Sequence, residues 1–279
     1  MRPLEDHAQV LQHYDSTDDL GARILAALEK TGFAQGTLSP ADTASLDQFH
    51  VGGLAATEEL ANRLSGTIHS KTIVLDVGSG LGGPSRYLAS RFGCSVVGVD
   101  LSESYCRAAE MLAERSGLEK KVSYRTSDAL HLPFEDATFD LLWTQHVVMN
   151  IADRAKLYAE FARVLKRGGC LAMYDVVEGR NGQIHFPVPW AREPHLSHLL
   201  TPEDTRKVLE RSGFRSVVWE EMSSEALEWL RMAAASPQTS PLGLHILLGK
   251  DFPEMIRNFR RNLEEHRCGI LQAVMLHKN

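Results

Sequence analysis

The stretch that most constrains the fold runs from residue 73 to residue 102, IVLDVGSGLGGPSRYLASRFGCSVVGVDLS. An apolar run is followed by a cluster of glycines, an amphipathic segment and a second apolar run that ends in an acid. This order predicts a strand, a tight turn, a helix and a second strand. Parallel sheets use such a unit to bind a cofactor, because the turn brings the backbone and the positive end of a helix close to an anion.

The glycines fit two templates at once. Gly78, Gly80 and Gly83 have the GxGxxG spacing of dinucleotide sites, whereas Gly78, Gly80 and Gly82 have the GxGxG spacing of loops that bind S-adenosylmethionine (SAM). In the first case the helix end would face a pyrophosphate, and in the second the carboxylate of a methionine. The glycine spacing by itself leaves both ligands open.

Three acids distinguish these ligands. Asp76 lies two residues before Gly78, where a carboxylate would repel a pyrophosphate but suits the α-ammonium and sulfonium of SAM. Asp100 ends the next apolar run and is placed to accept hydrogen bonds from ribose hydroxyls in either ligand. Asp128 follows a third predicted strand and suits an adenine amino group. The acids favour SAM, and an NAD-dependent oxidoreductase remains the weaker alternative.

Strands and helices alternate through the middle of the chain. Helices are predicted over residues 8–33, 54–65, 83–92, 103–116, 153–165, 201–214, 224–235 and 253–266. Strands are predicted over residues 73–77, 95–100, 121–126, 139–145, 170–177, 214–221 and 270–277. The helix over 153–165 is expected to end at KRGG, with Gly168 and Gly169 as its C-terminal break. The alternation predicts an α/β fold with a mostly parallel sheet and helices on both faces.

Composition places the chain among ordinary globular proteins. It has 279 residues, of which 43% are hydrophobic, and a formal net charge of −6, which gives no electrostatic footprint for nucleic acid. No apolar run approaches the roughly 18 residues of a membrane span, and the N-terminus lacks the apolar core of a signal peptide. Four scattered cysteines without CxxC spacing are interpreted as reduced thiols of a cytoplasmic protein. No metal site is predicted.

Four motifs resemble those of class I SAM-dependent methyltransferases: DVGSGLGGPSRYLA, GVDLS, SDALHLPFEDATFDLLWTQ and ARVLKRGGCLAMYD. The resemblance covers roughly residues 50–220 and is closest to the small-molecule branch of the UbiE/Coq5-like enzymes. HVGGLAAT and the closing RRNLEEHRCGILQAVMLHKN look like the sarcosine/dimethylglycine N-methyltransferases. The resemblance implies a Rossmann-like sheet of seven strands, the last antiparallel, with SAM across the carboxyl ends of its first half.

The resemblance also implies roles for residues and segments. Asp76, Gly78 and Gly80 would face the methionine end of SAM, and Gln145 would lie near the transferring methyl. Asp100 and Leu101 would contact ribose and adenine, and Asp128 and Ala129 the adenine. Residues 1–53 would form a helical N-terminal lid. Residues 54–279 would form the methyltransferase domain, with acceptor-side insertions at 178–200 and 223–266, the second a helical insertion before the last strand.

The acceptor pocket is expected outside the strand ends. Three segments can contribute to it: the turn after the fourth predicted strand, the irregular insertion HFPVPWAREPHLSHLL and the N-terminal region. His146, which follows Gln145 directly, is the candidate general base or orienting group. The other candidate pocket residues are Tyr14, His50, Asn150, Trp190, Arg192 and His198.

The predicted function is transfer of the SAM methyl group to a small molecule, with S-adenosylhomocysteine (SAH) as the product. The favoured acceptor is an amine of the glycine, sarcosine or dimethylglycine type. Trp143, Phe186 and Trp190 could surround its ammonium, and Arg192 could hold its carboxylate. The alternatives are C- or O-methylation of a quinol or phenolic metabolite, and SAM binding without turnover. A homodimer is a possible assembly.

Overall fold

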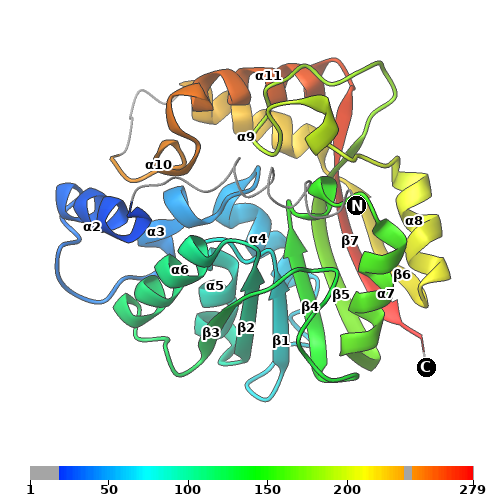
Figure 1. The fold of residues 1–279 in the computed structure, drawn as a ribbon, viewed down its shortest axis with the longest axis horizontal. Helices are drawn as coiled ribbons and strands as arrows, with labels where there is room; N and C mark the ends of the chain where they lie inside the picture. Colours follow the sequence, from blue (N-terminus) through cyan, green and yellow to red (C-terminus); the bar gives the residue numbers. More distant parts are fainter. Residues whose placement is uncertain (1–18, 236–240, 279) are drawn as a thin grey trace.

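A computed structural model describes residues 19–235 and 241–278. Its centre is one sheet of seven strands in the order β3-β2-β1-β4-β5-β7-β6 (Figure 1). The strands are β1 (Ile73–Val77), β2 (Ser95–Asp100), β3 (Val122–Thr126), β4 (Phe139–Gln145), β5 (Leu165–Glu178), β6 (Phe214–Glu221) and β7 (Cys268–His277). The first five strands pair in parallel, and β7 is antiparallel to both β5 and β6. The predicted seven-stranded sheet with an antiparallel last strand is confirmed.

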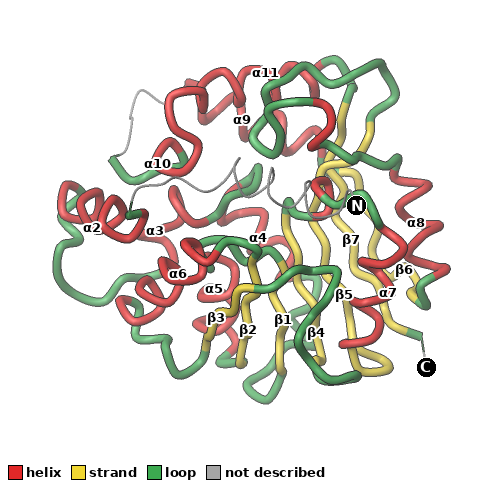
Figure 2. The backbone as a smooth tube through the Cα atoms, viewed as in Figure 1, coloured by secondary structure: helices red, strands yellow, loops and turns green. Residues whose placement is uncertain are grey.

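Helices cover both faces of this sheet, as predicted (Figures 1 and 2). Helices α4 (Gly53–Asn62), α5 (Gly83–Phe92) and α6 (Glu103–Arg115) pack with the core cluster on one face, and α7 (Arg154–Val164) and α8 (Pro202–Arg211) with the cluster on the other. The remaining elements are α2 (Leu20–Lys30), α3 (Pro40–Asp47), α9 (Ser223–Ala235), α10 (His245–Leu248), α11 (Phe252–Glu264), η1 (Val148–Asn150), η2 (Pro194–Leu196) and η3 (Gly249–Asp251).

The two faces follow from the two-residue period of the strands. In β1, Val74 belongs to the core cluster beneath α4 and α5, while Leu75 and Val77 belong to the cluster beneath α7. Both faces of the parallel strands are therefore apolar, and polar groups collect where the strands end. Because these strands are parallel, β1, β2, β3 and β4 all end at the same edge of the sheet.

The predicted C-terminal break at KRGG is wrong. Helix α7 ends at Val164, and β5 already begins at Leu165, so Gly168 and Gly169 lie inside a strand. Phe139 pairs with Leu165 but Leu141 pairs with Cys170, which leaves extra residues of β5 in a bulge where Gly168 has a φ of +75°. Glycine tolerates a positive φ in a bulge as readily as at a helix end, so the sequence signal was ambiguous.

The segment before the sheet is only partly described. Of the helix predicted over 8–33, the structure describes α2, and the preceding residues lie outside the described part. Helix α2 contributes Ile24 and Leu28 to a third apolar cluster, which also contains Tyr105 and Leu112 of α6 and Met255 of α11. Within residues 19–235 and 241–278, no helix combines the length and the apolar character needed to cross a membrane.

Candidate functional site

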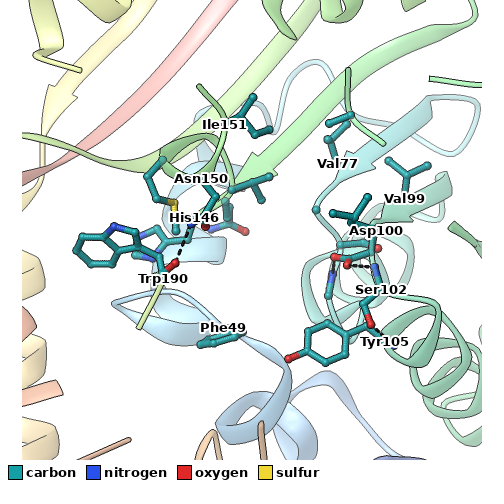
Figure 3. A pocket seen from close by; sticks show the side chains of 18 of the residues that line it. Phe49, Val77, Val99, Asp100, Ser102, Tyr105, His146, Asn150, Ile151 and Trp190 are labelled. Atoms are coloured by element: carbon teal, nitrogen blue, oxygen red, sulfur yellow. Dashed lines mark hydrogen bonds between the residues drawn. The ribbon is translucent and has the colours of Figure 1, made fainter. Parts of the chain in front are cut away.

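A cavity of about 330 Å³ lies at the edge of the sheet where β1, β2 and β4 end. Figure 3 shows its labelled side chains in two groups, with Asp100, Ser102 and Tyr105 on one side and His146, Asn150 and Trp190 on the other. Every residue predicted to bind the cofactor lines this cavity: Asp76, Gly78, Gly80, Asp100, Leu101, Asp128, Ala129 and Gln145. The predicted acceptor residues His50, His146, Asn150, Trp190 and His198 line it as well.

The glycine loop connects β1 to α5 and forms one wall of the cavity. The N–H groups of Gly78 and Ser79 donate to the carbonyl of Val99 over 2.8 and 3.0 Å, which ties the loop to the end of β2. Gly78 has a φ of +71°, and a Cβ on it would come within 2.1 Å of a methyl of Val147. Gly80 has a φ of +52°, and a Cβ on it would meet no atom within 4 Å. Both backbone conformations favour glycine, and at Gly78 a side chain would in addition clash with Val147.

Two of the predicted acids lie on either side of this loop. Asp100 accepts hydrogen bonds from the N–H of Gly80 over 2.9 Å and from that of Ser102 over 3.0 Å. The buried carboxyl of Asp76 accepts a hydrogen bond of 2.6 Å from the hydroxyl of Ser85. Burial raises the pKa of Asp76 to about 7, and the nearby Asp100 charge adds to the rise. A cation that entered here would be attracted to both carboxylates.

The third acid lies farther along the cavity. Asp128 accepts a hydrogen bond from the N–H of Leu130 over 2.8 Å and lies 3.1 Å from Nδ1 of His131. Ala129 and Leu130 follow it in the wall. The result is a carboxylate beside an apolar surface, the arrangement predicted for a ring that carries an amino group.

The turn after β4 carries His146. Its backbone has a φ of +52°, and its N–H donates to the carbonyl of Tyr174 over 2.8 Å. One carboxylate oxygen of the buried Asp175 then accepts the next two N–H groups, those of Val147 over 3.3 Å and Val148 over 2.7 Å. Asp175, a residue that the sequence did not single out, thus holds the turn against β5.

Gln145 belongs to a buried polar cluster. Its Oε1 accepts hydrogen bonds from Nε1 of Trp143 over 2.8 Å and from the hydroxyl of Thr57 over 3.1 Å. The Thr57 hydroxyl also lies 2.6 Å from Oε1 of Gln48 and 3.1 Å from Nε2 of His50. The indole N–H can only donate, so it fixes Oε1 of Gln145 on that side. The Nε2 of Gln145 is buried and has no partner among the described residues.

His146 packs among rings. It stacks on Tyr174 with a centroid distance of 5.6 Å and an interplanar angle of 6°, and its centroid is 6.0 Å from that of His50. Burial and the neighbouring His50 hold the pKa of His146 well below its ordinary value, and burial lowers the pKa of His50 to about 4. Both imidazoles are therefore neutral near pH 7. The Nε2 of His146 is buried without a partner in the described part of the chain.

The insertion over 178–200 completes the far wall. Nδ2 of Asn150 donates to the carbonyl of Trp190 over 2.7 Å and to that of Leu196 over 3.0 Å, which fixes the insertion to η1. Nε1 of Trp190 donates to the hydroxyl of Ser197 over 2.9 Å, and the N–H of His198 donates to the carbonyl of Met149 over 2.8 Å. Tyr14, another predicted pocket residue, lies outside the described residues.

Three expectations for the acceptor pocket are wrong. Arg192 does not line the cavity, because its guanidinium pairs with Asp251 of η3 on the surface. Trp143 is fully buried with its N–H on Gln145, and Phe186 packs against the main core cluster, so neither lines the cavity. Arg192 and Asp251 lie 59 residues apart in the sequence, so local pattern cannot predict that they form an ion pair.

Sequence reasoning also missed part of the wall. Tyr105 and Asp47 line the cavity, and the buried Asp47 forms an ion pair of 2.5 Å with the equally buried Arg86 of α5. Phe49, which belongs to the N-terminal region expected to contribute to the pocket, lines it as well. Among the described residues, no group of three His, Cys, Asp or Glu side chains is placed to hold a metal ion. The four cysteines are buried free thiols.

Comparisons with known proteins agree with this geometry. The methyltransferase-domain family matches residues 75–173. The chain is 38% identical over 136 residues to the methyltransferase GfsG of Streptomyces halstedii, covering 49% of this chain and 48% of that protein. It is 31% identical over 170 residues to the glycine/sarcosine/dimethylglycine N-methyltransferase of Actinopolyspora halophila, covering 60% and 30%. The matches thus span half or less of the length of these relatives.

A solved structure of geranyl diphosphate methyltransferase with geranyl diphosphate and sinefungin has the same fold. Its TM-score is 0.72 at 18% sequence identity, with 98% of this chain and 99% of that chain covered. The comparisons confirm the predicted resemblance to SAM-dependent methyltransferases and support SAM as the cofactor. They do not single out the UbiE/Coq5-like branch.

Proposed function

We propose that this chain, whose residues 75–173 match the methyltransferase-domain family, transfers the methyl group of SAM to a small molecule. The proposal rests on one observation above all. A single cavity joins the edge that carries the glycine loop and Asp76, Asp100 and Asp128 to the wall that carries His50, His146 and Trp190. A cofactor and an acceptor can therefore meet in one cavity.

The described residues suit SAM. No atom lies within 4 Å of the position that a Cβ on Gly80 would take, and a larger residue would adopt its backbone conformation only with strain. The N-terminal end of α5 follows three residues later. Asp76 and the glycine loop are proposed to hold the methionine end, Asp100 and Leu101 the ribose and adenine, and Asp128 and Ala129 the adenine. Gln145 would lie near the methyl group. Asp76, Asp100 and Asp128 are acidic side chains, and a carboxylate matches the positive charge of SAM.

SAM supplies a methyl group already activated by its sulfonium. The chain then has three tasks: to hold the acceptor atom in line with the methyl, to keep water out and to accept a proton where the acceptor carries one. His146 is the proposed proton acceptor, because it lines the cavity, is neutral and follows Gln145 at the end of β4. For a productive acceptor, His146→Asn should lower kcat by about 10²–10⁴ and leave SAH affinity intact.

The acceptor class is the finer part of the proposal. An amine of the glycine type remains one candidate, and the similarity to an N-methyltransferase supports it. However, Arg192, which was expected to hold its carboxylate, is paired with Asp251 outside the cavity. C- or O-methylation is the second candidate, because the apolar side chains of Phe49, Met149 and Trp190 line the cavity together with His146.

The cofactor assignment is tested with Asp100→Ala. Hydrogen bonds to a charged acceptor contribute roughly 1.5–3 kcal/mol each, so the affinity for SAH should fall at least about tenfold in calorimetry. Asp136→Ala, which removes an exposed carboxylate outside the cavity, is the matched control. Unchanged SAH affinity in Asp100→Ala would remove Asp100 from the site, and binding of NAD in place of SAH would point to an oxidoreductase.

Turnover separates an enzyme from a protein that only binds SAM. A panel of glycine, sarcosine, dimethylglycine, ethanolamine derivatives, catechols and quinols is incubated with methyl-labelled SAM, and labelled products are separated. Product formation supports the proposal, and tight SAH binding without any labelled product favours the non-catalytic alternative. A lid formed by residues 1–53, a homodimer and a cytoplasmic location remain predictions.

A further inference from the structure

Two adjacent side chains at the end of β4 have hydrogen-bonding capacity that the described residues leave unused. Nε2 of Gln145 is a donor without a partner among the described residues, and its amide cannot turn over, because the indole N–H of Trp143, which can only donate, is bonded to Oε1. The ring of His146 makes no hydrogen bond within the described residues, and its Nε2 is buried. Other unpartnered buried atoms occur in the described part of the chain, for example on Gln272 in the core, but Gln145 and His146 are adjacent and both line the cavity, where a ligand can approach them.

The protonation state of the histidine limits what that ligand can be. A neutral imidazole has one N–H and one lone pair, so it can accept a single hydrogen bond. The wall thus offers an amide donor from Gln145 and an acceptor from His146. An acceptor atom that accepts a hydrogen bond from Gln145, donates one to His146 and still attacks a methyl group must carry one hydrogen and two lone pairs.

We infer that the acceptor atom is the oxygen of a neutral hydroxyl group, an alcohol, phenol or enol, which accepts a hydrogen bond from Gln145 and donates one to His146. This inference rests on the proposed methyl transfer and names its substrate class. A neutral amine nitrogen has only one lone pair, which it needs for the attack, so it leaves the Gln145 donor unsatisfied. A tertiary amine such as dimethylglycine carries no hydrogen for His146.

The proton balance leads to the same class. An oxygen lone pair forms the new C–O bond, the electrons of the C–S bond pass to sulfur, and the hydroxyl proton passes to the lone pair of His146 and then to water. The products are a methyl ether, SAH and a proton. As the C–O bond forms, the hydroxyl proton becomes strongly acidic, so even a weakly basic imidazole can take it. By contrast, His146 with its lowered pKa is too weak a base to deprotonate an ordinary ammonium.

Three small probes of matched shape test the inference. Phenol, aniline and toluene are titrated into the SAH-loaded protein, and binding is followed by ligand-observed NMR. Phenol should bind at least about tenfold more tightly than toluene, since it can satisfy both groups, and more tightly than aniline, whose nitrogen is a poor hydrogen-bond acceptor. Gln145→Met and His146→Asn should each bring phenol to within about twofold of toluene.

Matched controls have the same substitutions at positions away from the cavity. Gln272→Met changes a fully buried glutamine of β7, and His277→Asn changes a histidine that contacts the carbonyl of Lys166. Both should keep the preference for phenol. Toluene or aniline binding as tightly as phenol, or an unchanged preference in both Gln145→Met and His146→Asn, would overturn the inference.

SAH calorimetry on the same samples distinguishes a failure of the hydroxyl assignment from a failure of the proposed methyl transfer. A chain that binds SAH and lacks the preference for phenol would retain the proposed methyl transfer and lose the hydroxyl assignment. A chain that does not bind SAH would lose the proposed function itself. Thermal unfolding followed by circular dichroism shows separately that Gln145→Met and His146→Asn fold.

Discussion

The His146 backbone has a conformation that side chains other than glycine rarely adopt. A φ of +52° in a non-glycine residue costs about 1 kcal/mol or more. The hydrogen bonds around the turn offset this: the N–H groups of His146, Val147 and Val148 all have acceptors on β5. A histidine held in a strained conformation, with a neutral ring at a cavity wall, is the arrangement expected where function fixes the geometry.

Asp76 predicts how pH changes cofactor binding. Its pKa in the folded chain, about 7, lies above the ordinary 3.8. The stability it contributes is therefore fully present below about pH 4 and is lost as the pH rises through 7. The groups that act on it are Ser85, which donates a hydrogen bond, and Asp100, which repels its charge. A cation prefers the ionised carboxyl, so SAM should bind several-fold more tightly at pH 8 than at pH 6.

Calorimetry with SAM at the two pH values, in buffers of different ionisation enthalpy, measures both the affinity and the protons released. Asp76→Asn cannot titrate and should bind SAM with nearly the same affinity at pH 6 and pH 8. If the wild-type protein also lacks the difference, the carboxyl of Asp76 does not face the cationic end of SAM.

At the scale of elements, the loop between β1 and α5 and the turn after β4 are packed as one unit. Gly78 and Gly80 of the loop both have a positive φ, but of these two only Gly78 also requires space, because Val147 occupies the position of its Cβ. Gly80→Ala should therefore cost about 1 kcal/mol of unfolding free energy. Gly78→Ala carries the same backbone penalty plus a steric clash and should cost about 1–3 kcal/mol more.

Denaturant unfolding of the two alanine variants measures this difference. The double variant Gly78→Ala, Val147→Ala should recover part of the loss, because it removes the methyl groups that the new Cβ meets. Equal destabilisation by Gly78→Ala and Gly80→Ala would mean that the loop relaxes away from Val147, and the two segments are then not coupled.

At the scale of the whole molecule, segments far apart in the sequence close the cavity together. The end of α3 reaches it through Asp47 and is tied to α5 by the buried pair with Arg86, while the insertion reaches it through Trp190 and His198. A ligand that fills the cavity contacts all of these segments. Ordering by the ligand should therefore slow local opening near α2 and α3.

Limited trypsin digestion tests this expectation. Cleavage after Lys30, at the exposed end of α2, should slow several-fold when SAH is present at saturating concentration. Cleavage after Lys120, in the exposed turn between α6 and β3, provides the internal control and should keep its rate. Equal rates at Lys30 with and without SAH would mean that the α2–α3 region is packed on the body independently of the ligand.

Local pattern indicated the alternation of strands and helices and the cofactor edge of the cavity, whereas the antiparallel last strand followed from the resemblance to methyltransferases. Strand and helix periods are set by neighbours within a few residues, and a glycine loop after a strand fixes where the chain turns, so Asp76, Asp100 and Asp128 could be placed at neighbouring strand ends. The same locality explains the error at Gly168, where a bulge and a helix end have the same signature. Local pattern therefore predicted the residues at the cofactor edge of the sheet better than those of the acceptor wall.

Only the tertiary structure decided the acceptor wall. Whether Arg192 faces a ligand or Asp251, whether the ring of His146 is neutral, and which way the Gln145 amide points all depend on partners that come from distant segments. Charge, burial and hydrogen-bond direction are properties of a three-dimensional environment, because desolvation and Coulomb interactions act through space. Thr57 and Asp175 shape the site for this reason, although no pattern in the sequence marked them, and Trp143 acts from the core through Gln145 rather than from the cavity wall.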